Sequence, residues 1–442
     1  MNLRILRVEE LGVQSLLRQL ERGAEGADET VTAQVRAIIE DVRQRGDRAL
    51  LEYTRRFDGV TLSPQAIRVT DEERRDAERA VSLEITEALR YAARRIEAFH
   101  ENQRSVSWFV YDEHGSLLGM KVTPIDRAGL YIPGGSAAYP STVLMNGLPA
   151  KVAGVPERIL CSPPGLDGRM NPVVLTAARL AGVTQCFKVG GAQAIAAMAY
   201  GTETIPRVDK VVGPGNRYVA SAKRLVFGQV GIDMIAGPSE VVVVADHTGE
   251  ASWIAADLLA QAEHDVLARA ICLTPSAELA EAVRGEVSRQ LKELPRQEIA
   301  TKALEGHGAV VVTRDLSEAI ELVNGLAPEH LELMVADPFA LLPDVRHAGA
   351  IFLGRHTPEV VGDYVAGPNH VLPTGGTARF SSPLGVEDFV KRSNVIHYSR
   401  AGLDAAWIRL RLVAGAERLD AHARAAQVRL EQGDHGSSPT AR

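Results

Sequence analysis

The stretch that decides the fold is residues 158–226, RILCSPPGLDGRMNPVVLTAARLAGVTQCFKVGGAQAIAAMAYGTETIPRVDKVVGPGNRYVASAKRLV. Short apolar runs at Ile159–Cys161, Phe187–Val189 and Lys210–Val212 are typical of buried strands. Between and after them lie segments with helical character, at 173–181, 192–200 and 217–226. Strand, crossover helix and strand at this spacing predict a parallel sheet that helices cover on both faces.

A second series of alternating segments begins at Glu240. Its predicted strands are 241–245, 269–273 and 308–313. Its predicted helices are 251–263, 277–291 and 316–325. Two such series predict two α/β units of related architecture, although no sequence repeat joins them.

The two ends of the chain carry a different pattern. The first hundred residues show helical periodicity with little strand signal, at 9–21, 29–45 and 71–99. Beyond about Phe380 we expect a strand at Val395–Tyr398 and helices near 402–413 and 416–431. The polar tail Gly433–Arg442 is expected to be disordered.

Composition excludes several classes of protein. The formal net charge of -7 over 442 residues disfavours a nucleic-acid partner, because phosphate binding needs clustered positive charge. No apolar stretch reaches the roughly 18–20 residues of a membrane helix. The first ten residues, MNLRILRVEE, contain acids too early for a signal peptide. Three widely spaced cysteines in apolar runs, at 161, 186 and 272, are expected to be buried core residues of a cytoplasmic protein.

Two predicted turns between strand and helix are rich in glycine, at 190–191 and 213–215. Glycine lets the backbone approach a ligand, and the following helix N-terminus favours an anion such as a pyrophosphate. Neither turn has the G-x-G-x-x-G spacing of a dinucleotide-binding loop. Tight turns in a parallel sheet explain the same glycines, so the turns alone leave both interpretations open.

Four polar residues in separate segments form a candidate metal site. Gln261 and His264 are three residues apart at the end of a predicted helix and share one face. Asp363 lies in a loop dense in glycine and proline, and His422 lies on a C-terminal helix. An amide oxygen, two imidazoles and a carboxylate suit zinc. A capping histidine, a plain turn and a solvated helix face explain the same residues, and their spacing does not show that they converge.

Adjacent Glu329 and His330 follow a proline and precede a strand-like run, Leu331–Val335. Neighbours on an extended chain point in opposite directions, so we expect the two side chains to reach different faces of one substrate. That arrangement suits a reaction in which proton abstraction and water activation are separate steps. A solvated turn is the alternative interpretation.

Together these segments resemble the histidinol dehydrogenase family, in matching order from about residue 25 to 430. The most specific stretches are Tyr131–Gly135, Val189–Gln193, Gly213–Asn216, Ala236–Glu240, Gln261–His264, Ala327–His330, Gly362–Tyr364, Asn369–Pro373 and the pair Glu417 and His422. The resemblance implies oxidation of L-histidinol to L-histidine through L-histidinal, in two successive NAD-dependent steps that end histidine biosynthesis.

The resemblance also implies a set of site residues. The implied zinc ligands are Gln261, His264, Asp363 and His422. In the family the last ligand comes from the other subunit of a homodimer, so His422 and Glu417 would cross the interface. The implied NAD contacts are Tyr131, Gln193 and Asn216. The implied substrate contacts are Ser239, Gln261, His264, His330, Asp363, His370, Glu417 and His422.

The fold that the resemblance implies is α/β. It has two incomplete Rossmann-like parallel-sheet domains and smaller N- and C-terminal helical elements in an intertwined dimer. The expected boundaries are an N-terminal helical arm (1–28), one α/β domain (29–130 plus 239–375), an NAD-contacting α/β domain (131–238), a C-terminal helical dimerisation element (376–432) and a disordered tail (433–442).

Our hypothesis for the chemistry assigns the catalytic roles to Glu329 and His330. His330 takes the alcohol proton while hydride leaves for NAD, and Glu329 helps water add to the aldehyde carbon. Zinc acts mainly as a template that orients the substrate.

Three other functions are considered. A zinc- and NAD-dependent enzyme of the same fold could oxidise another small polyol, such as a sulfonated diol. An aldehyde dehydrogenase that forms a thiohemiacetal would need a reactive cysteine. A binding or scaffold protein without catalytic activity would not be expected to hold so many ionisable groups in special loops.

Overall fold

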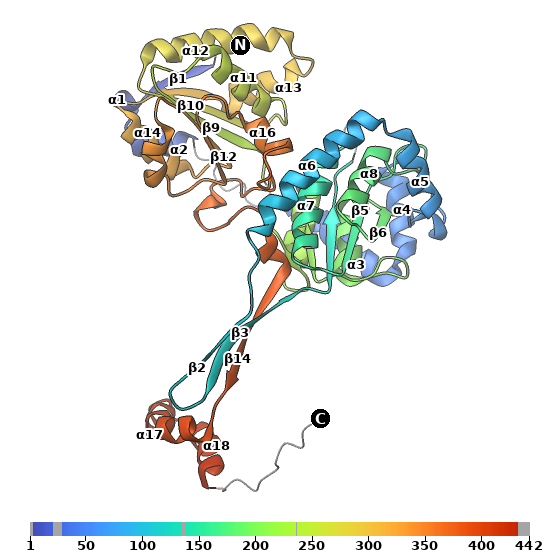
Figure 1. Cartoon of the computed structure of the whole chain (residues 1–442). Coiled ribbons are helices and arrows are strands. Elements are labelled where there is room, and N and C mark those ends of the chain that lie inside the picture. Colours follow the sequence, from blue (N-terminus) through green and yellow to red (C-terminus); the bar gives the residue numbers. More distant parts are fainter. Residues whose placement is uncertain (1–2, 21–28, 135–137, 236, 432–442) are drawn as a thin grey trace. The chain divides into compact units, whose positions relative to one another are not determined.

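The computed structural model describes residues 3–20, 29–134, 138–235 and 237–431 (Figure 1). Gly135, Ala236 and the tail 433–442, all named in the expectations above, lie outside these ranges. The chain forms two compact units. The first unit is Met1–Arg104 with Ile125–Phe389, and the second is Ser105–Pro124 with Val390–Arg442.

One sheet of the first unit, together with the helices that follow its strands, contains most of residues 158–226. Its five strands lie in the order β6-β5-β4-β7-β8, and every neighbouring pair is parallel. The strands are β4 (Arg127–Tyr131), β5 (Glu157–Ser162), β6 (Gln185–Lys188), β7 (Lys210–Val212) and β8 (Gly231–Ile232). Helices α8 (Pro172–Leu180), α9 (Gly191–Tyr200) and α10 (Arg217–Val226) follow β5, β6 and β7. The predicted parallel sheet is confirmed.

The other sheet of the first unit has six strands in the order β1-β11-β10-β9-β12-β13, again all parallel. They are β1 (Arg4–Arg7), β9 (Glu240–Ala245), β10 (Arg269–Thr274), β11 (Ala309–Val312), β12 (His330–Met334) and β13 (Ala350–Leu353). The helices between these strands are α11 (Ala251–Ala262), α12 (Ala277–Gln290), α13 (Gln297–His307) and α14 (Leu316–Leu326). Both faces of this sheet are covered, so β9 and β10 are buried along their whole length.

The first unit also contains several other helices. They are α1 (Val8–Leu11), α2 (Val13–Leu20), α3 (Glu29–Arg45), α4 (Asp47–Phe57), α5 (Asp71–Ala80), α6 (Leu83–Glu101), α7 (Pro140–Val152), α15 (Pro338–Leu341) and α16 (Glu359–Tyr364). Short 3-10 turns lie at 64–66, 291–293, 342–344, 377–379 and 386–389.

Helices within residues 29–101 pack against a different sheet from the one that the predicted domain boundaries assign to them. Buried Val35 and Ile39 of α3 pack in one cluster with Phe187 and Ile195 of the five-stranded sheet's layer. Residues 29–101 therefore pack with the five-stranded sheet, whereas the prediction joined 29–130 to 239–375. The N-terminal arm also contributes β1 to the six-stranded sheet, where the sequence predicted little strand. An apolar helix face fits either sheet, so periodicity alone could not assign it.

The second unit is an antiparallel sheet with two helices. Strand β3 (Leu117–Pro124) pairs with β2 (Trp108–Tyr111) and with β14 (Val390–His397). Helices α17 (Arg400–Ala416) and α18 (Asp420–Glu431) complete it. Strand β14 lies within the element predicted at 376–432 and begins five residues before the strand expected at Val395–Tyr398. Strand β2 is exposed along its length, so it lacks the buried alternation that predicts strands.

None of the helices in the part of the chain that the structure describes is both long and apolar enough to span a bilayer.

Candidate active site

The predicted catalytic pair lies where β9 and β12 begin in the six-stranded sheet. His330 is the first residue of β12 and pairs in register with Val241 of β9. Glu329 Oε2 accepts a hydrogen bond from the Glu240 backbone N–H (2.9 Å), and His330 Nδ1 lies 3.1 Å from the Glu240 carbonyl oxygen. The Glu240 peptide groups thus hold both side chains.

The two side chains lie side by side, so the prediction that they face opposite directions is wrong. His330 Nδ1 is 3.7 Å from Glu329 Oε2. Glu329 comes before the strand and two residues after Ala327, whose φ of 48° is left-handed. Strand alternation therefore does not apply to Glu329. Because Nδ1 donates to a carbonyl oxygen, the Nε2 of a neutral imidazole remains as a base.

Burial sets the protonation states of this pair and of His370. It lowers the pKa of His330 to about 3 and that of His370 to about 4, so both rings are neutral at pH 7. Burial also raises the pKa of Glu329 well above the usual carboxyl range. A carboxyl group shifted in this direction is a stronger base than an ordinary one.

Glu359, which the sequence analysis did not single out, contacts the predicted ligand Gln261. Gln261 in α11 is fully buried. Its amide nitrogen donates to both Glu359 carboxylate oxygens, at 2.8 and 3.0 Å. The amide nitrogen is assigned to this side because the reversed amide would place the Gln261 oxygen against the two Glu359 carboxylate oxygens. The amide oxygen therefore points away from Glu359.

Asp363 lies four residues after Glu359 on α16, so both project from one face. One ligand atom from each of His330, Glu359 and Asp363 lies within 4.8 Å of the others. Burial raises the pKa of Asp363 to about 6. Neither carboxylate makes an ion pair with a lysine or arginine among the ranges described above. An uncompensated group of N and O donors is the chemistry that a divalent cation needs.

His264 and His370 are the other predicted residues of the first unit at this site. Helix α11 ends at Ala262, one residue before the predicted end, so His264 lies in the following turn. Its backbone N–H donates to the Gln261 carbonyl oxygen (3.2 Å). His264 is exposed, and in its protonated form it adds to the effect of burial in lowering the pKa of both His330 and His370. His370 Nδ1 lies 3.0 Å from the Asp363 carbonyl oxygen.

A buried hydrogen bond and a buried ion pair connect the Glu240 side chain to Gly375 and to strand β10. Its Oε1 accepts from the Gly375 backbone N–H (2.7 Å), and its Oε2 lies 3.2 Å from Arg269 Nη1. Ser239, the predicted substrate contact, immediately precedes β9 and is partly exposed. Its carbonyl oxygen accepts from the Arg269 backbone N–H (3.0 Å).

Glu417 and His422 belong to the second unit. Glu417 follows α17, and His422 lies in the first turn of α18. Arg418 between them has a left-handed φ of 57°, which turns the chain from one helix into the next. Both predicted residues are exposed. The structure thus groups Gln261, Asp363 and His330 in the first unit and leaves these two side chains on the surface of the second.

The predicted NAD residues lie around the carboxyl ends of the five-stranded sheet. The Tyr131 hydroxyl, at the end of β4, accepts a hydrogen bond from the Gly191 backbone N–H (3.0 Å). Gln193 in α9 is buried, and its Oε1 has no hydrogen-bond partner in the described structure. Asn216 caps α10, with Oδ1 accepting from the Tyr218 and Val219 backbone N–H groups (3.0 and 3.2 Å).

A buried ion pair holds the second glycine turn. Lys223 Nζ donates to the Gly213 carbonyl oxygen (2.9 Å), and Asp233 Oδ2 accepts from the Gly213 N–H (2.8 Å). Lys223 and Asp233 also pair with each other. Gly213 has a φ of 120°, and a Cβ there would lie 2.1 Å from the Tyr131 carbonyl oxygen. The sequence analysis missed this pair, because its members lie on α10 and just after β8 with no local motif.

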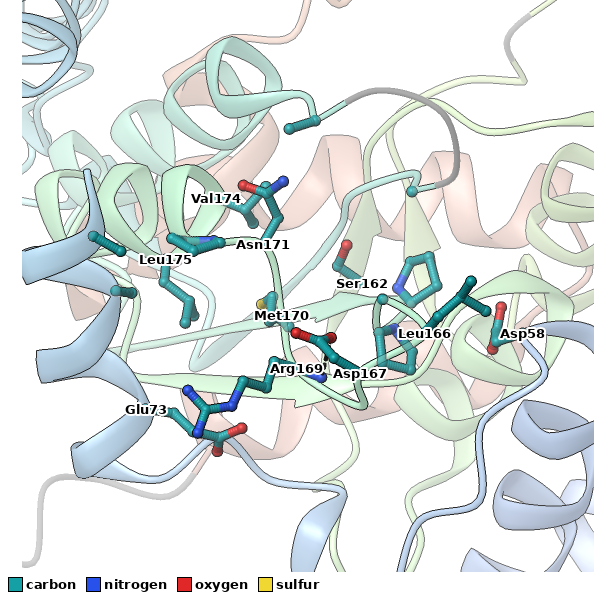
Figure 2. Close-up of a pocket in the computed structure, with 18 of the residues that line it drawn as sticks. Asp58, Glu73, Ser162, Leu166, Asp167, Arg169, Met170, Asn171, Val174 and Leu175 are labelled. Atoms are coloured by element: carbon teal, nitrogen blue, oxygen red, sulfur yellow. Dashed lines mark hydrogen bonds between the residues drawn. The ribbon is translucent and has the colours of Figure 1, made fainter. Parts of the chain in front are cut away.

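A cavity of about 680 Å³ lies between the end of β5 and the start of α8 (Figure 2). Figure 2 shows Asp58, Ser162 and Leu166 among its lining side chains. Asp58 Oδ2 is buried without a hydrogen-bond partner among the residues described, and burial raises the pKa of this carboxyl to about 6. The volume is typical of a small-molecule site. The sequence analysis did not identify Asp58, which lies in the turn after α4.

The sequence is similar to known proteins over almost its whole length. The sequence model described as histidinol dehydrogenase matches residues 21–430. A histidinol dehydrogenase of Geobacillus kaustophilus is 57% identical over 420 residues, which cover 95% of this chain and 98% of that protein. A histidinol dehydrogenase of Syntrophotalea carbinolica is 55% identical over 411 residues, 93% and 94% of the two chains.

Among solved structures, the chain is similar to a histidinol dehydrogenase from Elizabethkingia anophelis. The TM-score is 0.91 at 38% sequence identity, and the match covers 97% of this chain and 98% of that one.

Proposed function

Because the chain belongs to the histidinol dehydrogenase family, we propose that each active site holds zinc through Gln261, His264 and Asp363. The chain is an oxidoreductase that uses NAD and zinc and oxidises L-histidinol to L-histidine through L-histidinal. His422 of a second copy is the fourth zinc ligand in this proposal. The observation that carries the proposal is that these three residues come together at one place. Glu359 holds the Gln261 amide and has a carboxylate oxygen within 4.8 Å of one of Asp363, and His264 lowers the pKa of the neighbouring His330 and His370.

The donor set fits zinc. It combines imidazole nitrogen with carboxylate and amide oxygen, and Gln261 is fully buried. Zinc supplies a template and a positive charge that orient the substrate. The sequence hypothesis that the ligand amide is Gln261 agrees with its orientation, because Glu359 holds the amide nitrogen and leaves the oxygen pointing elsewhere.

His330 and Glu329 divide the proton transfers. In the alcohol oxidation, Nε2 of neutral His330 accepts the hydroxyl proton of histidinol. A hydride is transferred to NAD from the carbon that bears this hydroxyl group. In the aldehyde oxidation, Glu329 accepts a proton from the water that adds to the aldehyde carbon. His330 is neutral and so has a ring nitrogen that can accept a proton, and the raised pKa of Glu329 makes its carboxylate a stronger base than usual. The Glu240 peptide holds both side chains.

NAD binds along the carboxyl ends of the five-stranded sheet in this proposal. Tyr131, Gln193 and Asn216 lie at that edge, and the cavity lined by Asp58 accepts the adenosine part. A carboxylate is a suitable acceptor for ribose hydroxyls, and it would repel the 2′-phosphate of NADP. The unpaired, buried oxygens of Asp58 and Gln193 support this assignment.

A homodimer completes the site. Glu417 and His422 are exposed on the second unit, where they are available to another copy. The same unit exposes large apolar side chains, which need a partner surface. They include Trp108, Phe109, Val110, Tyr111, Ile408, Leu412 and Val413. We place the enzyme in the cytoplasm.

The competing functions are less well supported. Burial raises the pKa of all three cysteines, that of Cys186 to about 11 and that of Cys272 to about 12, so none suits a thiohemiacetal route. The relatives at 55–57% identity are histidinol dehydrogenases, which does not favour a sulfonated diol as substrate.

The zinc site is tested by Asp363→Asn. The substitution removes a charged ligand, so we expect zinc affinity to fall by at least about 100-fold. Competition with a chelator measures the dissociation constant. Glu321→Gln, on the exposed face of α14, is the matched control and should leave it unchanged. Unchanged zinc affinity in Asp363→Asn would remove Asp363 from the ligand set.

Asp58→Asn should have opposite effects on NAD binding and on stability. The pKa of Asp58 is raised in the folded protein, so its stabilising contribution is present below the unfolded pKa and is lost as pH rises through about 6. Asparagine avoids that loss, so the free energy of unfolding should rise at pH 7 and change little at pH 3.5. The KM for NAD should rise severalfold. Urea unfolding at both pH values and steady-state kinetics measure the two effects. A stability gain without a change in KM would place Asp58 outside the NAD site.

A further inference from the structure

Glu359 is a buried carboxylate that the mechanism above does not use. It lies in the first turn of α16 and is 3% exposed. Its backbone N–H donates to Glu332 Oε1 at 2.7 Å, which anchors the start of the helix to β12. Both of its carboxylate oxygens accept from the Gln261 amide nitrogen, at 2.8 and 3.0 Å.

We propose that Glu359 is a positioning residue that fixes the Gln261 amide with its oxygen toward the zinc ion. This inference rests on the proposed function, in which Gln261 is a ligand. A glutamine side chain can rotate its amide by a half turn at little steric cost, which exchanges oxygen for nitrogen. Only the oxygen has a lone pair for a metal. A carboxylate behind the amide favours a single orientation, because it accepts from nitrogen and repels oxygen.

Other contacts indicate that Glu359 positions Gln261 and does not act on the base His330. Its Oε1 is 3.7 Å from His330 Nδ1, beyond hydrogen-bond distance, and His330 Nδ1 is already engaged with the Glu240 carbonyl oxygen at 3.1 Å. The short contacts of Glu359 go to the amide of Gln261. Residues that orient a metal ligand in this way typically affect metal affinity by about 10–100-fold.

The test is a double-mutant cycle with zinc affinity as the readout. The four proteins are the wild type, Glu359→Leu, Gln261→Ala and the double variant, each as the full chain. We expect Glu359→Leu to weaken zinc binding by about 10–100-fold. In the Gln261→Ala background the same substitution should change affinity by less than about 2-fold, because the residue through which it acts is gone.

Two further measurements separate positioning from folding. Glu359→Gln keeps the size of the side chain and one oxygen that can accept from Gln261, so it should retain more zinc affinity than Glu359→Leu. The visible spectrum of the cobalt-substituted protein should change in the same way in Glu359→Leu and Gln261→Ala, since both lose the amide oxygen. Glu305→Gln, exposed on α13, is the control.

Each contrary outcome has its own meaning. If Glu359→Leu binds zinc with wild-type affinity, the inference about Glu359 is wrong, and the proposed ligand set is unaffected. A full loss that persists in the Gln261→Ala background also overturns the inference, because Glu359 would then act independently of Gln261. If Gln261→Ala itself binds zinc normally, the proposed ligand set fails and the inference fails with it.

Discussion

Replacing His330 with asparagine should lower kcat for histidinol oxidation by about 10²–10⁴-fold. His330 presents a neutral imidazole whose Nδ1 is held by the Glu240 carbonyl oxygen, so Nε2 can take the hydroxyl proton. Asparagine is of similar polarity but has no base at that position. Zinc content should stay at the wild-type level, because His330 is not among the proposed ligands.

The matched control is His347→Asn, which changes a histidine of the loop before β13. It should leave both kcat and zinc content unaffected. His330 lies in the same group of donor atoms as Asp363, so loss of zinc is the informative contrary result. A variant that loses zinc together with activity would make His330 a ligand rather than the base.

The second large effect is complementation between two inactive variants. His422→Ala should lose activity because it removes a proposed ligand, and His330→Asn because it removes the base. In a heterodimer of the two, one site combines an intact His330 with an intact His422 from the other chain. Random pairing on co-expression should then restore about a quarter of wild-type activity.

This recovery depends on the two residues coming from different chains. If both came from one chain, each subunit of the heterodimer would contain a broken site and activity would stay near zero. Co-expression of His330→Asn with Asp363→Asn is the control. Both of those residues lie in the first unit, so no intact site can form and no activity should return.

The sequence predicted both parallel sheets because their signal is local. Apolar runs at Ile159–Cys161 and Phe187–Val189 are short, and helical segments of regular length separate them. Such runs read as strands wherever both faces are buried. Strand β1 gave no such signal: it has four residues, two of them arginine, and it pairs with β11, more than 300 positions along the chain. Its pairing depends on tertiary structure and cannot be predicted from a short segment of sequence.

The candidate site was predicted only in part, because sequence patterns reveal local motifs but not contacts between distant segments. Glu329 and His330 are adjacent and stood out, but their relative orientation depends on the left-handed Ala327 and on the Glu240 peptide across the sheet. Glu359 follows a proline in a segment without a recognisable motif. Its importance appears only when α16 is placed against α11, where its carboxylate meets Gln261.

Asp58 and Lys223 were missed on similar grounds. A single aspartate after a helix is common, and only the fold shows that its carboxyl group is buried beside a cavity. A lysine on a helix usually points to solvent. Lys223 instead reaches the Gly213 carbonyl oxygen from within the core. Both residues depend on contacts between segments that are far apart in sequence.

The most direct test of the account is the number of NADH molecules formed per molecule of L-histidinol consumed, measured on the zinc-loaded protein. The account predicts about two NADH, with L-histidine as the product and no lasting accumulation of L-histidinal. A yield of about one NADH, with the aldehyde as the final product, would contradict it, because Glu329 and His330 would then complete only the first oxidation.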